Sequence, residues 1–149
     1  MTDPGQGDAA APIVVGEHLR VLSQVQSREL GPEEDIPAAD QAELEATATG
    51  SALDAALAAR AELRDNGWTQ TGEPEILSSE VIESALSEDP PRVVLGACVD
   101  SSKVQVTDAA GQPRRDPAAV RPTTNIFTLV FVDGRWRLGD LTFPDDPDC

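Results

Sequence analysis

The sequence predicts an α+β fold, in which helices from the first half of the chain pack on a curved antiparallel sheet from the second half. Three observations support this: a helical period in the first half, runs of branched residues in the second, and Asp133-Gly134 between two strand-like runs. Helices that precede the strands, rather than alternating with them, are typical of the α+β class. With 149 residues, we expect one domain over residues 12–149 after a flexible leader, residues 1–11, rich in Gly, Asp, Pro and Ala.

The first half of the chain has the pattern of helices separated by short connections. Apolar residues placed at 100° steps share one face over residues 13–30, which predicts the first helix. A second helix is expected over residues 38–49. Ser51 and Asp54 then have the spacing of a capping box, so we expect Ser51 to be the N-cap of a third helix. Asn66-Gly67 predicts the end of that helix, because glycine accepts the left-handed conformation.

The second half of the chain has the pattern of antiparallel strands. The strongest signal is a run of branched and aromatic residues that ends at Asp133-Gly134, a pair typical of a tight hairpin. In the returning strand the inward positions change parity at Gly139-Asp140, which predicts a β-bulge there. Strands are expected over residues 69–86 (as an extended arm), 93–99, 126–132 and 136–143.

The chain is strongly acidic. Its 27 acidic and 11 basic residues give a formal net charge of −16, which repels phosphate backbones and anionic lipid surfaces. We therefore expect no nucleic-acid partner. The charge is explained either by solubility, which we favour, or by a surface that attracts a basic partner. No apolar run is long enough to predict a transmembrane segment.

The two cysteines, Cys98 and Cys149, are far apart in the sequence. Together with a single histidine they provide too few ligands for a zinc site, so no metal is predicted. We favour a disulfide between them over two unrelated thiols; it would contribute about 4 kcal/mol in the chain-entropy model and indicates an oxidising compartment. The first residues lack the features of a secretory signal. The chain is thus expected to be extracytoplasmic if a leader has been removed, and otherwise cytoplasmic.

Three side chains are candidates for a site. His18, the only histidine, lies on the apolar face of the first predicted helix, where it is either a structural residue, which we favour, or a proton carrier. Asp54 or Asp140 would be an acid–base partner of His18 only if the expected fold places one of them beside it. Trp68 and Trp136 either line a pocket or anchor helix to sheet, and in a chain with so few aromatic residues we favour the second interpretation.

Motifs that carry catalysis or hold a cofactor are absent. The glycines form no phosphate-binding loop, and Ser101-Ser102 has no nucleophile elbow around it. The chain has no tyrosine, which removes the phenolic donor used by steroid-isomerase-like sites. We therefore predict no catalytic residue and no cofactor.

Several local phrases resemble the NTF2-like (SnoaL-like) cone-fold family, in particular its actinobacterial secreted or lipid-anchored members. The resemblance covers roughly residues 13–149 and implies a half-open cone, often with a pocket. The phrases lie in turns, caps and strand edges, and they are Ala48-Thr49-Gly50-Ser51-Ala52-Leu53, Asn66-Gly67 with Gly72-Glu73-Pro74, Ala97-Cys98-Val99-Asp100, Val104-Gln105-Val106-Thr107-Asp108-Ala109-Ala110-Gly111 and Trp136-Arg137-Leu138.

Three functions follow from these observations. The favoured one is a non-catalytic secreted or envelope-associated module, monomeric or homodimeric, that binds a protein or a small apolar ligand. The second is an isomerase or cyclase that uses His18 in the cone, and the third is an acidic cytoplasmic interaction protein. In a cone, the residues expected to line a ligand pocket are His18, Leu22, Trp68, Phe127 and Trp136.

Overall fold

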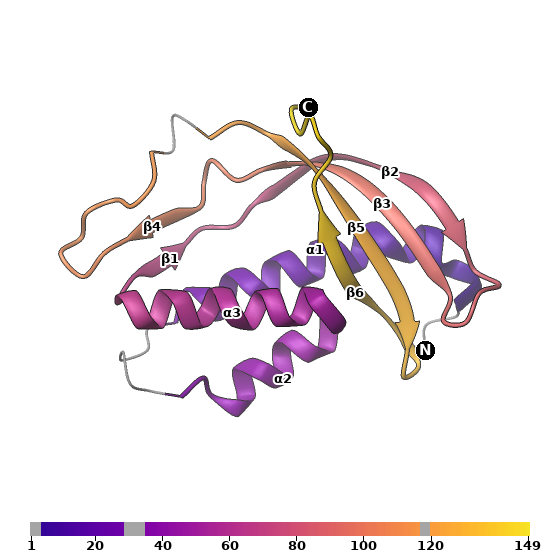
Figure 1. Cartoon of the computed structure of the whole chain (residues 1–149), viewed down its shortest axis with the longest axis horizontal. Helices are drawn as coiled ribbons and strands as arrows, with labels where there is room; N and C mark the ends of the chain where they lie inside the picture. The colour runs from indigo at the N-terminus through magenta and orange to yellow at the C-terminus, as the bar shows by residue number, and fades with distance from the viewer. Residues whose placement is uncertain (1–3, 29–34, 117–119) are drawn as a thin grey trace.

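Helices occupy the first half of the chain and strands follow, which confirms the predicted α+β class (Figure 1). The structure, a computed structural model, describes residues 4–28, 35–116 and 120–149. Its elements in chain order are η1 (Pro4–Gln6), α1 (Gly7–Gln26), α2 (Ala38–Thr47), α3 (Gly50–Asn66), β1 (Thr69–Thr71), β2 (Glu75–Ala85), β3 (Arg92–Asp100), β4 (Gln105–Thr107), β5 (Thr123–Val132) and β6 (Arg135–Thr142).

The strands of the described residues form two antiparallel sheets. The larger has the order β2-β3-β5-β6, and β1 pairs with β4 in a two-stranded extension. Asp133 and Gly134 join β5 to β6 with φ of 52° and 80°, the positive values that a tight hairpin turn requires. Leu129 faces Leu138 while Thr128 faces Asp140, so Gly139 is the extra residue of a bulge. The predicted hairpin and bulge are both confirmed.

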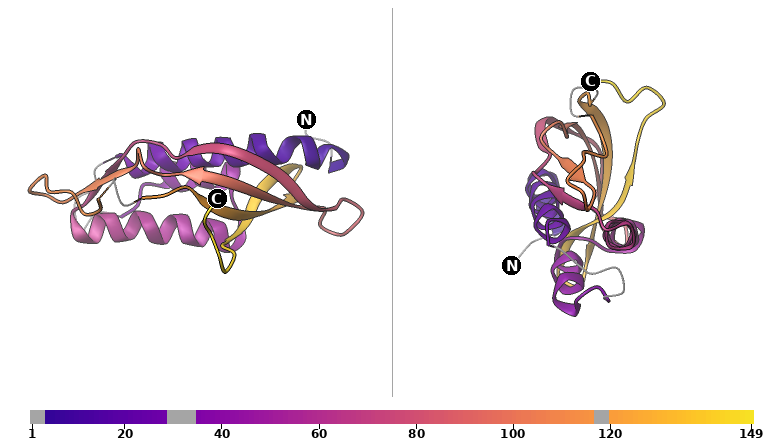
Figure 2. Two further views of the ribbon diagram at one scale, coloured as in Figure 1. Left: turned by 90° about the horizontal axis from the view of Figure 1, so that it is seen from above. Right: turned by 90° about the vertical axis from the view of Figure 1, so that its left-hand side faces the viewer.

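The main core lies between α1 and one face of the larger sheet, which we call the inner face. Alternate residues of β3 and β5 point to this face, and the first half of α1 covers it (Figures 1 and 2). Ala48 and Ala52, at the junction of α2 and α3, pack against the same cluster. Its strand residues are Val93, Leu95, Ala97, Val99, Phe127, Leu129, Trp136 and Leu138, and its α1 residues are Ala11 and Val15.

A second, smaller core joins the helices to one another. Val25 of α1, Leu44 of α2 and Ala56 of α3 are buried together beyond the end of the sheet. Val25, near the end of α1, therefore packs on the other two helices, and the one long helix α1 takes part in both cores (Figure 2).

The expected flexible leader is wrong over residues 7–11. These residues form the first turns of α1, and Gly7 and Ala11 are buried against the sheet. The content of Gly, Asp, Pro and Ala suggested a flexible leader, but three successive alanines favour a helix, and the absence of a side chain at Gly7 leaves room for the ring of Trp136. At its other end α1 stops at Gln26, earlier than expected, and residues 29 and 30 of the predicted helix lie outside the described residues.

The predicted capping box of α3 is also wrong. Thr49 occupies the N-cap position, and the Ser51 hydroxyl instead reaches the carbonyl of Gly139 at 3.1 Å and the carboxylate of Asp140 at 2.7 Å. Tertiary contact with the β6 bulge thus replaces the local cap. The predicted end of α3 is confirmed, because Gly67 is left-handed with φ of 67° and the next N–H, that of Trp68, donates to Leu63.

Candidate functional site

Two of the five expected pocket residues belong to the main core. Phe127 is 0 % exposed, so no space large enough for water adjoins its ring. Trp136 is buried against Gly7 of α1 and meets Phe131 edge-on, with ring centroids 5.6 Å apart. These aromatic residues anchor α1 to the sheet as part of the main core.

His18 is buried between α1 and α2. Its Nδ1 atom lies 2.9 Å from the Thr47 hydroxyl, and burial lowers the pKa of His18 from its ordinary 6.5 to about 4. The imidazole is therefore neutral at physiological pH. The two carboxylates considered as partners lie elsewhere, since Asp54 is exposed and Asp140 is bonded to Ser51. A neutral imidazole bonded to a hydroxyl is a structural arrangement rather than an acid–base pair.

The remaining two expected pocket residues lie at separate places. Leu22 packs against the small helical core, and Trp68, half-buried at the start of β1, carries the guanidinium of Arg114 at 4.9 Å from its ring centroid. The structure thus distributes the five residues over the main core, the helical core, the α1–α2 contact and the β1–β4 extension. It does not bring them together around one pocket.

The outer face of the larger sheet, opposite the inner face, and the edge strand beside it present a different surface. Its edge strand β2 is eleven residues long, and nine of them are exposed. Leu77, Val81 and Ile82 are 52, 39 and 54 % exposed, an unusual display of large apolar side chains on one strand. Along its other side β2 pairs only with β3 among the described residues, so one edge of the strand is open (Figure 1).

A groove of about 390 Å³ lies on this outer face, next to β2. Gly96 of β3 is part of its lining, and a Cβ atom there would lie only 2.8 Å from the side chain of Ile82. The disulfide between Cys98 and Cys149, with Cα atoms 6.0 Å apart, forms part of its lining and confirms the predicted pairing. The residues around the groove are Ser78, Ser79, Glu80, Ile82, Gly96, Ala97, Cys98, Thr124 and Cys149. We call β2 and this groove together the β2 surface.

The β2 surface is acidic. No lysine or arginine occurs between Arg64 and Arg92, and β2 itself carries Glu75, Glu80 and Glu83. Glu83 pairs with Arg92 at 2.8 Å and Glu75 with Lys103 at 3.5 Å, both near the ends of β2. The middle of the strand therefore keeps the negative charge of Glu80.

The β2 surface offers contacts rather than chemistry. Its side chains are apolar, hydroxyl or carboxylate groups, with neither a histidine nor a free thiol among the groove residues. Within the described residues, no group of three or more His, Cys, Asp or Glu is placed to hold a metal ion. The residues of β2 were expected only as part of an extended arm over residues 69–86. The signal in the sequence that points to this surface is three large apolar residues in a long stretch without basic residues.

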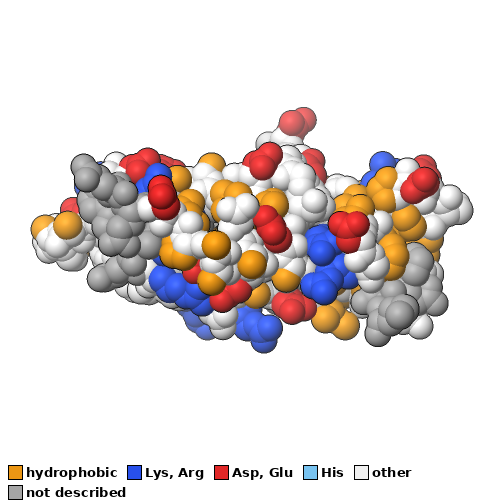
Figure 3. Space-filling model, turned by 90° about the horizontal axis from the view of Figure 1, so that it is seen from below, with side chains coloured by type: hydrophobic (Ala, Val, Ile, Leu, Met, Phe, Trp, Pro, Cys, Tyr) orange, Lys and Arg blue, Asp and Glu red, His pale blue; other side chains and the backbone are white. Residues whose placement is uncertain are grey.

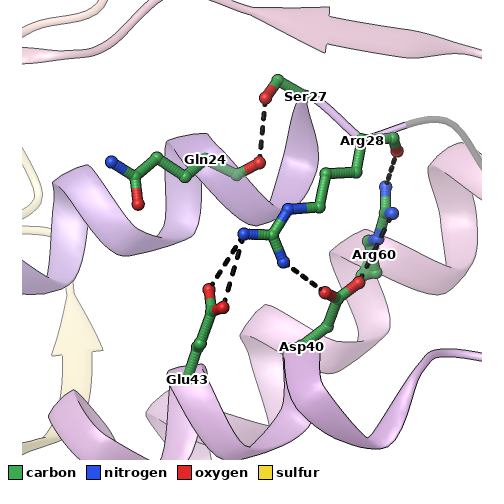
Figure 4. Close-up of polar contacts among 6 residues, drawn as sticks. All are labelled: Gln24, Ser27, Arg28, Asp40, Glu43 and Arg60. Carbon is green, nitrogen blue, oxygen red and sulfur yellow. Dashed lines mark hydrogen bonds and ion pairs between the residues drawn. The ribbon is translucent and has the colours of Figure 1, made fainter.

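An ion-pair network links the three helices near the end of α1 (Figure 4). Arg28, just after α1, lies between the carboxylates of Asp40 at 2.5 Å and Glu43 at 3.2 Å. The buried Arg60 of α3 donates to the Arg28 carbonyl at 2.5 Å and lies 3.6 Å from Asp40. The hydrogen bond to Asp40 raises the pKa of Arg28, whereas burial lowers that of Arg60. Each cation has a partner within the helices, so this cluster is structural.

The surface seen from below, where α2 lies, has a mixed character. Acidic and basic side chains are interspersed there with small hydrophobic patches (Figure 3). Large apolar side chains on a strand that carries acidic but no basic residues are instead found on β2. Among the described surfaces, β2 is thus the best candidate for a binding site.

Comparison with known proteins identifies the fold. Neither a family model nor a curated protein matches the chain. Solved structures do, and 13 of their chains are similar. One is the crystal structure of the intermembrane space region of the chloroplast protein ARC6, with a TM-score of 0.62 and 16 % sequence identity, covering 96 % of this chain and 97 % of that one. At this identity the likeness shows a shared fold over almost the whole chain.

In the described residues, no helix has the length and hydrophobicity that crossing a membrane requires.

Proposed function

We propose that this chain is a non-catalytic, extracytoplasmic module of the NTF2-like class that binds a protein partner through the β2 surface. The observation that carries the proposal is the open edge strand, with Leu77, Val81 and Ile82 largely exposed on it. Single exposed apolar residues are common on soluble proteins, but several on one edge strand are typical of an interaction surface.

Other features support the two parts of this proposal. The Cys98–Cys149 disulfide favours an oxidising compartment, because cytosolic reductants keep most thiols reduced. Phe127 and Trp136 fill the inner face, which favours a protein over a small ligand held inside the cone. The pairing of His18 with Thr47 gives no support to an isomerase or cyclase.

Site-specific photocross-linking in the source cells tests the proposal. A photoreactive amino acid replaces Ile82 in one variant and Ile13 in a control. Ile13 is a matched control because it is an isoleucine that is also exposed, at 69 %, but on α1 instead of the sheet. We expect an adduct of one defined mass from position 82 alone, suppressed by excess unlabelled protein but not by excess of the double variant Leu77→Asp/Ile82→Asp. Absence of an adduct at position 82, or the same adducts from both positions, would contradict the proposed function.

A further inference from the structure

The open edge of β2 indicates how a partner binds. Resting on the proposed function, we propose that the partner contributes an extended, basic segment that adds to the free edge of β2 as a further strand of the larger sheet. Backbone hydrogen bonds would supply most of the affinity, and the side chains next to β2 would determine the selectivity, as in other cases of strand addition.

The backbone of β2 has the geometry for this addition. One side of the strand pairs with β3 from Glu75 to Ala85, and the other side has no strand beside it in the described part of the chain. An unpaired edge of this length is a template for another strand unless something blocks it. Neither proline nor a lysine occurs within β2 to block it.

Two bulges define the part of β2 where pairing is regular. The register shifts between Ile76 and Ser78 and again between Val81 and Glu83, so Leu77 and Ile82 are the extra residues. Between them, Ser78–Val81 pairs with β3 without interruption. The exposed Leu77 and Ile82 thus flank a short regular stretch, which suits a short segment with apolar side chains next to them.

Charge decides between a basic partner and a second copy of this chain. An antiparallel pair of β2 strands centred on the regular stretch would place the glutamates of two copies close together, which is unfavourable in cross-strand pairs. A lysine or arginine on the added strand would instead lie beside Glu80, which forms no ion pair with the described cations, whereas Glu75 and Glu83 do. The net charge of −16 also favours association with a basic chain.

A synthetic probe tests the strand addition on the full-length protein. The probe is a short peptide in which lysine and valine alternate; one control has glutamate for lysine, and another is N-methylated at alternate amides, which removes its backbone donors. Binding is measured by calorimetry at low ionic strength, and hydrogen exchange locates it. The protein variants are Glu80→Lys and, as a control with the same charge change, Glu62→Lys on the exposed side of α3.

We expect the basic peptide to bind, to slow amide exchange in β2, and to lose most of its affinity on N-methylation. Glu80→Lys should weaken binding roughly fivefold, in the range of an exposed charge pair reversed, and Glu62→Lys should weaken it much less. Failure to bind, equal binding of the N-methylated peptide, or equal effects of the two substitutions would overturn the proposal. So would a dimer, shown by sedimentation, that protects β2 without peptide. If any of these results is found while position 82 still gives an adduct in the source cells, strand addition by a basic segment is wrong. The proposed function then still holds, with a partner of a different kind.

Discussion

Gly7 packs closely against the indole ring of Trp136, a contact that joins the start of α1 to β6. A Cβ atom at position 7 would collide with the ring carbons, and with a methyl group of Val93 behind them. The contact lies at the edge of the main core, where the first helix meets the sheet. It explains why a glycine stands at the first position of this helix.

Gly7→Ala should therefore destabilise the protein. Overpacking at this position should lower the free energy of unfolding by about 1–3 kcal/mol, measured by urea denaturation. Gly16→Ala is the matched control in the same helix, because its added methyl group would have no described neighbour within 4 Å beyond the adjoining residues and backbone of the helix itself. That variant should gain up to about 1 kcal/mol from helix propensity. Equal effects of the two substitutions would show that Trp136 does not press on α1.

Cys149→Ser should release the C-terminal tail and lower stability. The disulfide closes a loop with a sequence separation of 51, and the Thr124 amide also holds the tail through the Pro147 carbonyl at 2.6 Å. The loss should be about 2–4 kcal/mol, seen as a lower Tm. Reductant should lower the Tm of the wild type towards that of the variant and leave the variant unchanged. A wild-type Tm that does not respond to full reduction would contradict a stabilising role.

The stability of the protein should fall as the pH drops from 6.5 towards 4. Burial lowers the pKa of His18 to about 4. Between pH 6.5 and 4 the histidine is therefore protonated in the unfolded chain but still neutral in the folded chain, which favours unfolding. Above pH 6.5 both states are neutral and the effect vanishes; below about pH 4 the loss levels off at about 3 kcal/mol. Because carboxylates also titrate at low pH, the effect of His18 is the difference between wild type and His18→Gln. NMR gives a direct check, since the only histidine resonance should not titrate between pH 8 and 5.5.

Asp40→Asn should be more damaging than Glu43→Gln. Asp40 is the carboxylate nearest the buried guanidinium of Arg60, and its neutralisation would leave that cation without a counter-charge in the helical core. The expected loss is about 3 kcal/mol by chemical denaturation. Glu43 contacts only the half-exposed Arg28, so its neutral variant should cost less than about 1 kcal/mol. Similar costs for the two variants would rule out a buried pair.

Local signals in the sequence predicted the elements that depend on local physics. The hairpin at Asp133-Gly134, the bulge at Gly139 and the end of α3 at Gly67 all follow from backbone preferences of a few residues. The start of α1 and the cap of α3 were not predicted, because Gly7 and Ser51 contact residues of β6 that are distant in the sequence. Tertiary contacts override local signals at such positions.

The candidate site was harder to predict from the sequence than the fold. Aromatic residues and a histidine suggested a pocket, but Phe127, Trp136 and His18 are all buried in packing contacts. The exposed face of β2 was hidden because its two bulges break the alternation that marks a strand. Its position at the sheet edge depends on strand order, which no local pattern specifies.

The central claim is that the β2 surface, rather than the interior of the cone or the helices, binds the partner. The most direct test is the Kd of the cross-linked partner, once isolated, for the wild type, for Leu77→Asp/Ile82→Asp and for Ile13→Asp. We predict a loss of at least about tenfold for the double variant and an unchanged Kd for Ile13→Asp, because apolar anchors dominate binding energy. An unchanged Kd for the double variant would contradict the claim.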